Sequence, residues 1–341
     1  MIALEEHFAI ADTLDDSEQY AATAGASSAA AWSELRAKLL DVDAMRLAEM
    51  DAYGIERSVL SLNSPGIQGI VDVARAIDAA RRGNDALADA IARHPTRFSG
   101  FAALPMQDPD AAAAEFTRSI RELGLKGALV NGFSQIGSPN DVIYYDDPRY
   151  ASFWSVVEQL GAPFYLHPRD PLPTREPIYD GHPWLTGPVW AFAMETAIHA
   201  LRLMASGLFD RHPGLTLILG HLGEGLPYNI WRADHRLRKV SRGMPARRPL
   251  GDYLRANFYL TTSGNFRTPT LMDAIAEVGV ARILFSVDYP FERTVDAVDW
   301  FKDVPLAEAD RRAIAAENSA GLFGWRSSTV EDAIETPRNS G

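Results

Sequence analysis

The sequence contains no cysteine at any of its 341 positions. This absence excludes disulfides, thiolate nucleophiles, iron–sulfur clusters and zinc sites built from cysteine. A metal ion bound by this chain must therefore be held by histidine and carboxylate side chains.

Positive charge is also scarce, and no run of lysine or arginine concentrates it locally. The chain has 45 acidic against 33 basic residues, which gives a formal net charge of -12. A surface of that sign repels phosphate backbones and anionic lipids. We therefore expect neither nucleic acid nor a membrane as a partner.

Long apolar runs are missing as well. Nowhere do ~18 apolar residues follow one another, as a membrane-spanning helix requires. The first segment, MIALEEHFAI, carries acidic residues where a signal peptide has a basic start and a long apolar stretch. The composition, with 47% hydrophobic and 23% charged residues, is that of a globular protein. These features predict a globular protein of the cytoplasm.

Short β-branched or apolar runs alternate with stretches of helical periodicity along most of the chain. The runs are Ile2–Glu5, Ile55–Leu62, Phe98–Leu104, Leu125–Val130, Pro163–Leu166, Leu215–Leu219, Phe258–Thr262 and Arg282–Ser286. The helical stretches include Val71–Arg93, Ala111–Leu123, Tyr150–Leu160, Ala191–Leu208 and Pro269–Val278.

This alternation predicts an α/β protein with one (β/α)8 barrel of the TIM type over residues 1–325, and a doubly wound open sheet is the alternative. Residues 326–341 are polar and carry no apolar repeat, so we expect a tail or an arm on a neighbouring subunit. No linker indicates a second domain.

Two long irregular stretches, Phe8–Ala30 and Pro168–Pro188, follow the first and fifth predicted strands. In a barrel, loops after strands lie on the face where active sites form, so both are candidate lids. Tyr20 and His182 lie in these loops and could line a pocket; a surface or packing role is the alternative.

Histidines and carboxylates gather where the predicted strands end. Glu5, Glu6 and His7 end the first strand, and the others are His167 on the fifth, His221 on the sixth and Asp288 on the eighth. Because side chains alternate along a strand, Glu5 and His7 point the same way and can bind one ion.

A single histidine at a strand end is usually structural, but these strand ends converge on one mouth of the predicted barrel. Carboxylates gathered there are costly to desolvate unless a cation neutralises them, which favours a metal site. The remaining helical histidines, His94, His199, His212 and His235, are interpreted as structural. Phe291 follows Asp288 and Pro290 into the loop after the eighth strand, where it either stacks on an aromatic ring or packs.

Six segments together resemble one known family. They are ALEEHFAI at 3–10, GALVNGFSQ at 127–135, FYLHPRDPLP at 164–173, ILGHLGEGLP at 218–227, TTSGNFRT at 261–268 and LFSVDYPFE at 284–292. In this order they resemble the amidohydrolase superfamily, in its branch of metal-dependent nonoxidative decarboxylases, and within it the γ-resorcylate (2,6-dihydroxybenzoate) decarboxylases.

The resemblance implies a role for particular residues of this chain. Glu5, His7, His167 and Asp288 correspond to the family's metal ligands. His221 and Glu224 correspond to its sixth-strand histidine and the glutamate three residues on, Arg232 to an arginine on the following helix, and Asn131 to a residue supplied after the fourth strand. It also implies a homodimer or homotetramer.

Two departures from the hydrolytic amidohydrolases concern the metal. The first-strand motif is Glu-x-His rather than His-x-His, and the added carboxylate suits Mn²⁺ or Mg²⁺ as well as Zn²⁺. The only lysine near the fourth strand, Lys126, stands at its beginning, away from the mouth, so no carboxylated lysine can bridge two ions. We therefore expect one divalent ion.

The resemblance implies loss of CO2 from a hydroxybenzoate, most simply 2,6-dihydroxybenzoate to resorcinol, and reversibly. Asp288 is the expected proton donor to the ring carbon, with His221, oriented by Glu224, setting its protonation state. A hydrolase of a cyclic ester or amide on the same barrel is the alternative enzyme, since the same residues can activate water. A binding barrel that has lost catalysis is the alternative from another class.

Overall fold

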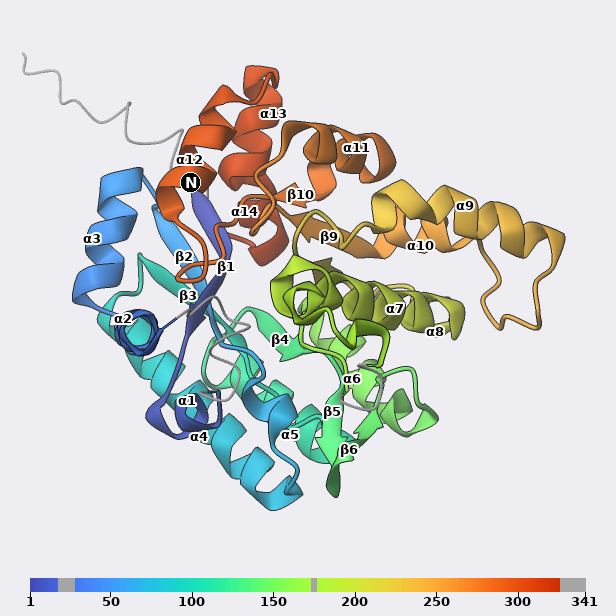
Figure 1. Cartoon of the computed structure of the whole chain (residues 1–341), viewed down its shortest axis with the longest axis horizontal. Coiled ribbons are helices and arrows are strands. Elements are labelled where there is room, and N and C mark those ends of the chain that lie inside the picture. The colour runs from blue at the N-terminus through green and yellow to red at the C-terminus, as the bar shows by residue number, and fades with distance from the viewer. Residues whose placement is uncertain (18–27, 173–176, 326–341) are drawn as a thin grey trace, which may run out of the picture.

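The strands form a barrel in which chain order and spatial order coincide. The structure is a computed structural model that describes residues 1–17, 28–172 and 177–325 (Figure 1). One eight-stranded parallel sheet contains, in order, β1 (Ile2–Phe8), β2 (Arg57–Leu62), β3 (Phe98–Ala102), β4 (Gly127–Asn131), β7 (Phe164–His167), β8 (Leu217–Leu219), β9 (Phe258–Thr261) and β10 (Ile283–Leu284). The predicted barrel is confirmed. The doubly wound alternative is wrong, because that topology reverses the strand order part-way through the sheet.

Backbone hydrogen bonds bring the chain after β10 back to β1. The N–H of Asp288 donates to the carbonyl of Glu5 at 3.1 Å, and the N–H of His7 donates to the carbonyl of Tyr289 at 2.6 Å. These bonds lie at the carboxyl end of the last strand, so the closure also brings Asp288 beside Glu5 and His7.

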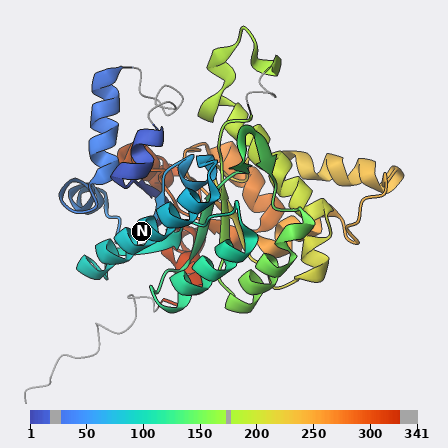
Figure 2. The same cartoon turned by 90° about the horizontal axis from the view of Figure 1, so that it is seen from below.

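Helices surround the strands in both views (Figures 1 and 2). They are α1 (Ala11–Ser17), α2 (Ala29–Leu40), α3 (Ala44–Tyr53), α4 (Val73–Arg93), α5 (Pro109–Arg121), α6 (Ala151–Leu160), α7 (Ala191–Ala205), α8 (Leu208–Arg211), α9 (Leu226–Lys239), α10 (Leu250–Asn257), α11 (Thr268–Val278), α12 (Thr294–Asp303), α13 (Glu308–Arg312) and α14 (Asn318–Phe323). Local sequence explains their starts: Asp72 caps α4 by accepting from the N–H of Arg75, and Asp108 caps α5 just before Pro109. No helix in the described residues is long and apolar enough to span a membrane.

The prediction of irregular structure over residues 8–30 is wrong in part. Helix α1 begins at Ala11, and α2 begins at Ala29, while residues 18–27 lie outside the described part. The α1 sequence has few apolar residues, so its periodicity is weak; it is held by tertiary contact, since Leu14 packs with Ala9 and Leu39. The second predicted loop is irregular apart from two short 3-10 turns, Pro183–Leu185 and Gly187–Val189, with 173–176 outside the described part.

A short antiparallel hairpin after β4 was not expected from the sequence. It pairs β5 (Ser134–Ile136) with β6 (Ser138–Ile143) around Gly137, whose φ of 71° is readily adopted only by glycine. β5 has only three residues, and β6 begins with the polar, proline-containing sequence SPND, so neither strand carries an apolar run. The predicted tail, residues 326–341, lies outside the described part of the chain.

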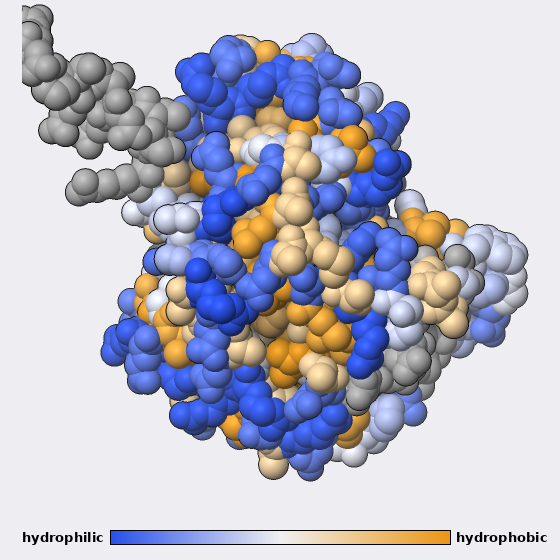
Figure 3. Space-filling view, turned by 90° about the vertical axis from the view of Figure 1, so that its left-hand side faces the viewer, coloured by the Kyte–Doolittle hydropathy of each residue, from blue (hydrophilic) through white to orange (hydrophobic). Residues whose placement is uncertain are grey.

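Apolar side chains fill both faces of the sheet. The barrel interior contains Ile2, Leu4, Val59, Phe101, Leu129, Tyr165, Ile218 and Leu284, and a larger cluster fills the space between strands and helices. On the face shown in Figure 3, hydrophilic side chains surround the edges and apolar ones gather towards the middle. Because these apolar side chains fill the barrel interior, the polar groups of the site lie above them, at the carboxyl ends of the strands.

Candidate metal centre

Four side chains from three strand ends meet at the mouth of the barrel. They are Glu5, His7, His167 and Asp288, and one potential ligand atom from each lies within 4.8 Å of all the others. Nε2 of His7 lies 3.1 Å from Oδ1 of Asp288, and Nε2 of His167 lies 3.1 Å from Oε1 of Glu5. The structure therefore brings together the four residues that the resemblance implies as ligands.

The atoms that face one another in this cluster are buried but not hydrogen-bonded. Among the described residues, Oε1 of Glu5, Nε2 of His7 and Oδ1 of Asp288 have no hydrogen-bond partner. Leaving such atoms unsatisfied is costly, whereas a cation between them would accept their lone pairs. Two carboxylates and two imidazoles suit Zn²⁺ or Mn²⁺, so the donor set fits one divalent ion.

Electrostatics keeps the ligand at the end of β1 ionised. Burial would raise the pKa of the Glu5 carboxyl, but the nearby imidazoles of His221 and His167 outweigh this effect and lower it below its ordinary value. Burial also lowers the pKa of His7, despite the neighbouring Asp288. A carboxylate and a neutral imidazole are the forms that bind metal.

Asp288 stands in a conformation that few residues adopt. Its φ is 81°, in the left-handed region, and its carbonyl accepts the N–H groups of Phe291 and Glu292 at 2.9 and 3.0 Å. Backbone of this kind is found mostly at functional sites, where surrounding contacts hold it.

His221 lies beside the cluster without belonging to it. Its Nδ1 lies 2.7 Å from Oε1 of Glu224, while Nε2 lies 3.7 Å from both Oε1 of Glu5 and Oδ2 of Asp288. Burial would lower the pKa of His221, but the carboxylates of Glu224 and Glu5 outweigh it and raise the pKa well above its ordinary value. His221 can therefore carry a proton at the edge of the site.

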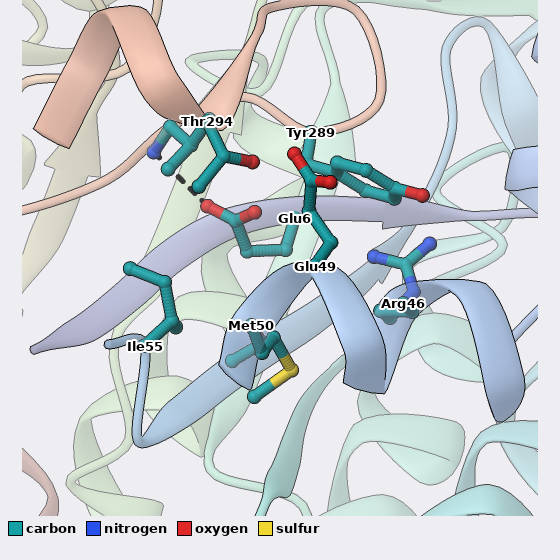
Figure 4. Close-up of a pocket in the computed structure, with 9 residues that line it drawn as sticks. Glu6, Arg46, Glu49, Met50, Ile55, Tyr289 and Thr294 are labelled. Atoms are coloured by element: carbon teal, nitrogen blue, oxygen red, sulfur yellow. Dashed lines mark hydrogen bonds between the residues drawn. The ribbon is translucent and has the colours of Figure 1, made fainter. Parts of the chain in front are cut away.

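Glu6 points to the opposite side of β1. Figure 4 shows it between β1 and α3, close to Arg46 and Tyr289, around a cavity of about 10 Å³. Its Oε1 accepts the N–H of Val287 at 3.0 Å, and burial raises its pKa to about 8. Arg46, also buried, donates to the carbonyl of His7.

The predicted substrate residues are placed unequally. The ring of Phe291 lies 5.4 Å from that of His7, and Asn131 is buried at the end of β4 with its N–H donating to Gln68. Arg232 and His182 are exposed, on α9 and in the loop after β7, and the structure does not bring them to the cluster. Tyr20 lies outside the described residues.

The four histidines interpreted as structural lie away from the cluster. His94 bonds Asp43, His212 bonds Glu158, and the ring of His235 stacks on Trp231. Nε2 of His199 accepts the N–H of Tyr145, and burial lowers its pKa to about 3.

The model of one protein family, described as amidohydrolase, matches residues 32–325. The chain belongs to the amidohydrolase family. This amidohydrolase is 58% identical over 324 residues to the γ-resorcylate decarboxylase of Rhizobium radiobacter, covering 94% of this chain and 97% of that one. The family resemblance inferred from the six segments is thereby confirmed.

Solved structures agree with this relationship. A crystal structure of 2,6-dihydroxybenzoate decarboxylase in complex with 2,6-dihydroxybenzoate has a TM-score of 0.91 and 57% identity, over 95% of this chain and 98% of the other. The dihydroxybenzoic acid decarboxylase of Polaromonas sp. JS666, with bound manganese and the inhibitor 2-nitroresorcinol, has a TM-score of 0.90 and 55% identity, over 95% and 96% of the two chains.

Three hydroxyl-bearing residues of this amidohydrolase next to Glu5 were missed from the sequence: Tyr165, Thr261 and Ser263. One signal could have found the first of them. Tyr165 stands two residues before His167 on the same strand, so alternation points both side chains into the barrel. Thr261 ends β9 and Ser263 follows two residues later; that strand carries no histidine or carboxylate, and nothing in their spacing distinguishes the two residues.

Proposed function

We propose that this amidohydrolase is a carboxy-lyase that removes CO2 from a hydroxybenzoate without oxidation, with 2,6-dihydroxybenzoate and resorcinol as substrate and product of a reversible reaction. One observation carries the proposal: the four converging ligands, with His221 at their edge, occur in a chain that is 58% identical to a γ-resorcylate decarboxylase over nearly its full length.

Glu5, His7, His167 and Asp288 would hold one divalent ion, for which Mn²⁺ or Zn²⁺ are the first candidates and Mg²⁺ the next. When bound, the ion supplies positive charge that attracts the carboxylate and the adjacent phenolic oxygen of the substrate and withdraws electron density from them. The related structure with bound manganese supports the choice of Mn²⁺.

The chain's own residues move the proton. Asp288, whose carboxylate faces both His7 and His221, would deliver a proton to the ring carbon that bears the carboxylate. The bond between that carbon and the carboxylate then breaks, CO2 leaves, and the electron pair of the broken bond restores the aromatic ring. His221, held by Glu224, would share the proton with Asp288 and so set its protonation state.

Phe291 and Asn131 are the substrate contacts best supported by their positions. The Phe291 ring beside His7 can pack on an aromatic substrate, and Oδ1 of Asn131 is buried with no hydrogen-bond partner among the described residues. The proposal of Arg232, His182 and Tyr20 as further contacts has no such support.

A homodimer or homotetramer and a cytoplasmic location complete the proposal. Large apolar side chains that are exposed on α7, α9 and the segment before α7, among them Trp184, Trp190, Ile198 and Trp231, support the assembly. Sedimentation at micromolar concentration tests it, and a monomer would contradict it.

The activity is tested by incubating metal-replete protein with 2,6-dihydroxybenzoate, 2,3-dihydroxybenzoate and salicylate. We expect 2,6-dihydroxybenzoate to react fastest of the three acids and to give resorcinol and CO2. Resorcinol formed in D2O should carry deuterium at the carbon that lost CO2. Hydrolysis of an ester or lactone with no CO2 release from any acid would overturn the proposal in favour of a hydrolase.

A further inference from the structure

The two oxygens of the Glu5 carboxylate have different surroundings. Glu5 is fully buried. Its Oε2 accepts a hydrogen bond from the hydroxyl of Tyr165 and another from that of Ser263, at 2.5 Å, and a longer one from Thr261 at 3.4 Å. Its Oε1, which faces the imidazoles, accepts none from the described residues.

The three hydroxyl groups also contact one another, and because Tyr165 and Ser263 donate to Oε2, the single hydroxyl hydrogen of Thr261 is shared among its contacts. The hydroxyl of Tyr165 lies 2.8 Å from that of Thr261, and the hydroxyl of Thr261 lies 2.9 Å from that of Ser263. All three side chains are fully buried, and the N–H of His221 donates to Ser263 at 3.2 Å. Because each member has a buried partner on another strand, the array is rigid and none of its hydroxyls can turn to water.

A glycine leaves room for this array. A Cβ added at Gly220 would lie 2.7 Å from Oε2 of Glu5 and 3.2 Å from the hydroxyl oxygens of both Tyr165 and Ser263. The φ of Gly220 is not in the left-handed region, so a larger residue is excluded by space and not by backbone conformation. The missing side chain of Gly220 thus leaves the space in which the three hydroxyls surround Oε2, a space called the cradle below.

We propose that Tyr165, Thr261 and Ser263 are positioning residues that hold Glu5 as a ligand through one oxygen. They saturate Oε2, so that only Oε1 is left to bind a cation beside His7 and His167. Carboxylates bind cations through one or both oxygens, and fixing the group in advance removes the cost of ordering it. The inference rests on the metal site of the proposed function, and it assigns the orientation of one ligand to residues that bind neither metal nor substrate.

The test measures Mn²⁺ binding instead of decarboxylation. Mn²⁺ is titrated into full-length protein freed of metal by a chelator, and unbound Mn²⁺ is followed by electron paramagnetic resonance. We expect Tyr165→Phe, which removes one donor to Oε2, to weaken Mn²⁺ binding about 10- to 100-fold. The matched control is Tyr145→Phe, because Tyr145 is equally buried and its hydroxyl bonds Ser134, away from the cluster.

A second pair of variants tests the cradle without removing a hydroxyl. Gly220→Ala should weaken Mn²⁺ binding by a similar factor, whereas Gly321→Ala should not, because a Cβ at Gly321 would meet nothing within 4 Å. Circular dichroism of each metal-free variant checks that it is folded. Where Tyr165→Phe fails to fold, Ser263→Ala is measured in its place with the same expectation.

Folded Tyr165→Phe or Ser263→Ala that binds Mn²⁺ as tightly as the wild type would overturn the inference and leave the proposed function intact. A wild-type protein that binds no divalent ion would overturn the proposed function itself, and the inference with it. Wild-type binding without decarboxylation of any acid would overturn the proposed activity alone, while the variants still decide the role of the hydroxyls.

Discussion

Glu224 holds the imidazole of His221 by Nδ1, at 2.7 Å, and thereby turns its Nε2 towards Glu5 and Asp288, each 3.7 Å away. Both residues of the pair have left-handed backbone, with φ values of 52° for His221 and 56° for Glu224. With Leu222, whose φ is 57°, this segment keeps three non-glycine residues in that region, and it aims the imidazole at the carboxylates at a cost in conformational energy. This cost is consistent with a role in function.

Glu224→Gln should retain both fold and metal, because Gln is nearly isosteric and Glu224 is not among the four ligands. Turnover should fall on the order of 10²- to 10⁴-fold, as is typical when a group that orients a general acid or base is lost. The measurement is kcat together with metal content. Glu158→Gln, which alters a similar pair with His212 far from the cluster, is the control and should leave kcat unchanged.

Asp288→Asn should give a folded, metal-loaded and inactive protein. Asn tolerates the left-handed backbone at this position and keeps an oxygen that can bind a cation, but it cannot donate a carboxylic proton. Elemental analysis and single-turnover assays of the loaded variant measure the two properties separately. Near-normal decarboxylation would show that the proton comes from another group, with His221 next in order.

Elemental analysis of the wild type should find about one divalent ion per chain, and its removal by a chelator should abolish activity. His167→Ala should lower metal occupancy, because it removes one of the four converging ligands. His94→Ala should not, since His94 bonds Asp43 on another face of the barrel. Two tightly bound ions per chain, or equal losses in both variants, would contradict the assignment of the site.

Glu6 should make the stability of the metal-free protein depend on pH. Burial raises its pKa to about 8 in the folded chain, against an ordinary value near 4.5. Below the ordinary pKa both states are protonated and the contribution of Glu6 to stability is complete. As pH rises towards 8, only the unfolded state ionises freely, so the free energy of unfolding falls by at most ~1.4 kcal/mol per pH unit.

Gln is neutral at every pH and can accept the same hydrogen bond from Val287. The stability of Glu6→Gln relative to the wild type should therefore increase steadily from pH 5 to pH 8, as measured by urea unfolding with a chelator present. The exposed substitution Glu34→Gln should follow the wild-type pH dependence. Parallel curves for Glu6→Gln and the wild type would mean that Glu6 is ionised in the folded protein.

The sequence by itself determined the order of the elements and the strand ends that carry Glu5, His7, His167 and Asp288. Each strand is a short apolar run with a polar end, and in a closed parallel sheet all such ends meet at one mouth. That inference needed no knowledge of which helix covers which strand. The pair Glu5 with His7 follows in the same way from the alternation of side chains, and the same rule, had it been applied to the fifth strand, pairs the missed Tyr165 with His167.

The tertiary structure alone decided which side of β1 each carboxylate occupies. Ile2 and Leu4 point into the barrel, so unbroken alternation would also have pointed Glu6 inward and Glu5 outward. The register of β1 against β2 shifts between Ala3 and Glu6, and this irregularity reverses the alternation. Glu5 and His7 therefore face the cluster, while Glu6 packs against α3.

Only the tertiary structure also decided which hydroxyl groups surround Glu5. Thr261 and Ser263 stand more than 250 positions after Glu5, and only closure of the barrel brings their hydroxyls to its Oε2. Their hydroxyl groups are common in every part of a chain, so spacing cannot identify them. Hydrogen bonds between distant strands depend on register and on the packing of the barrel interior, and these are properties of the whole fold.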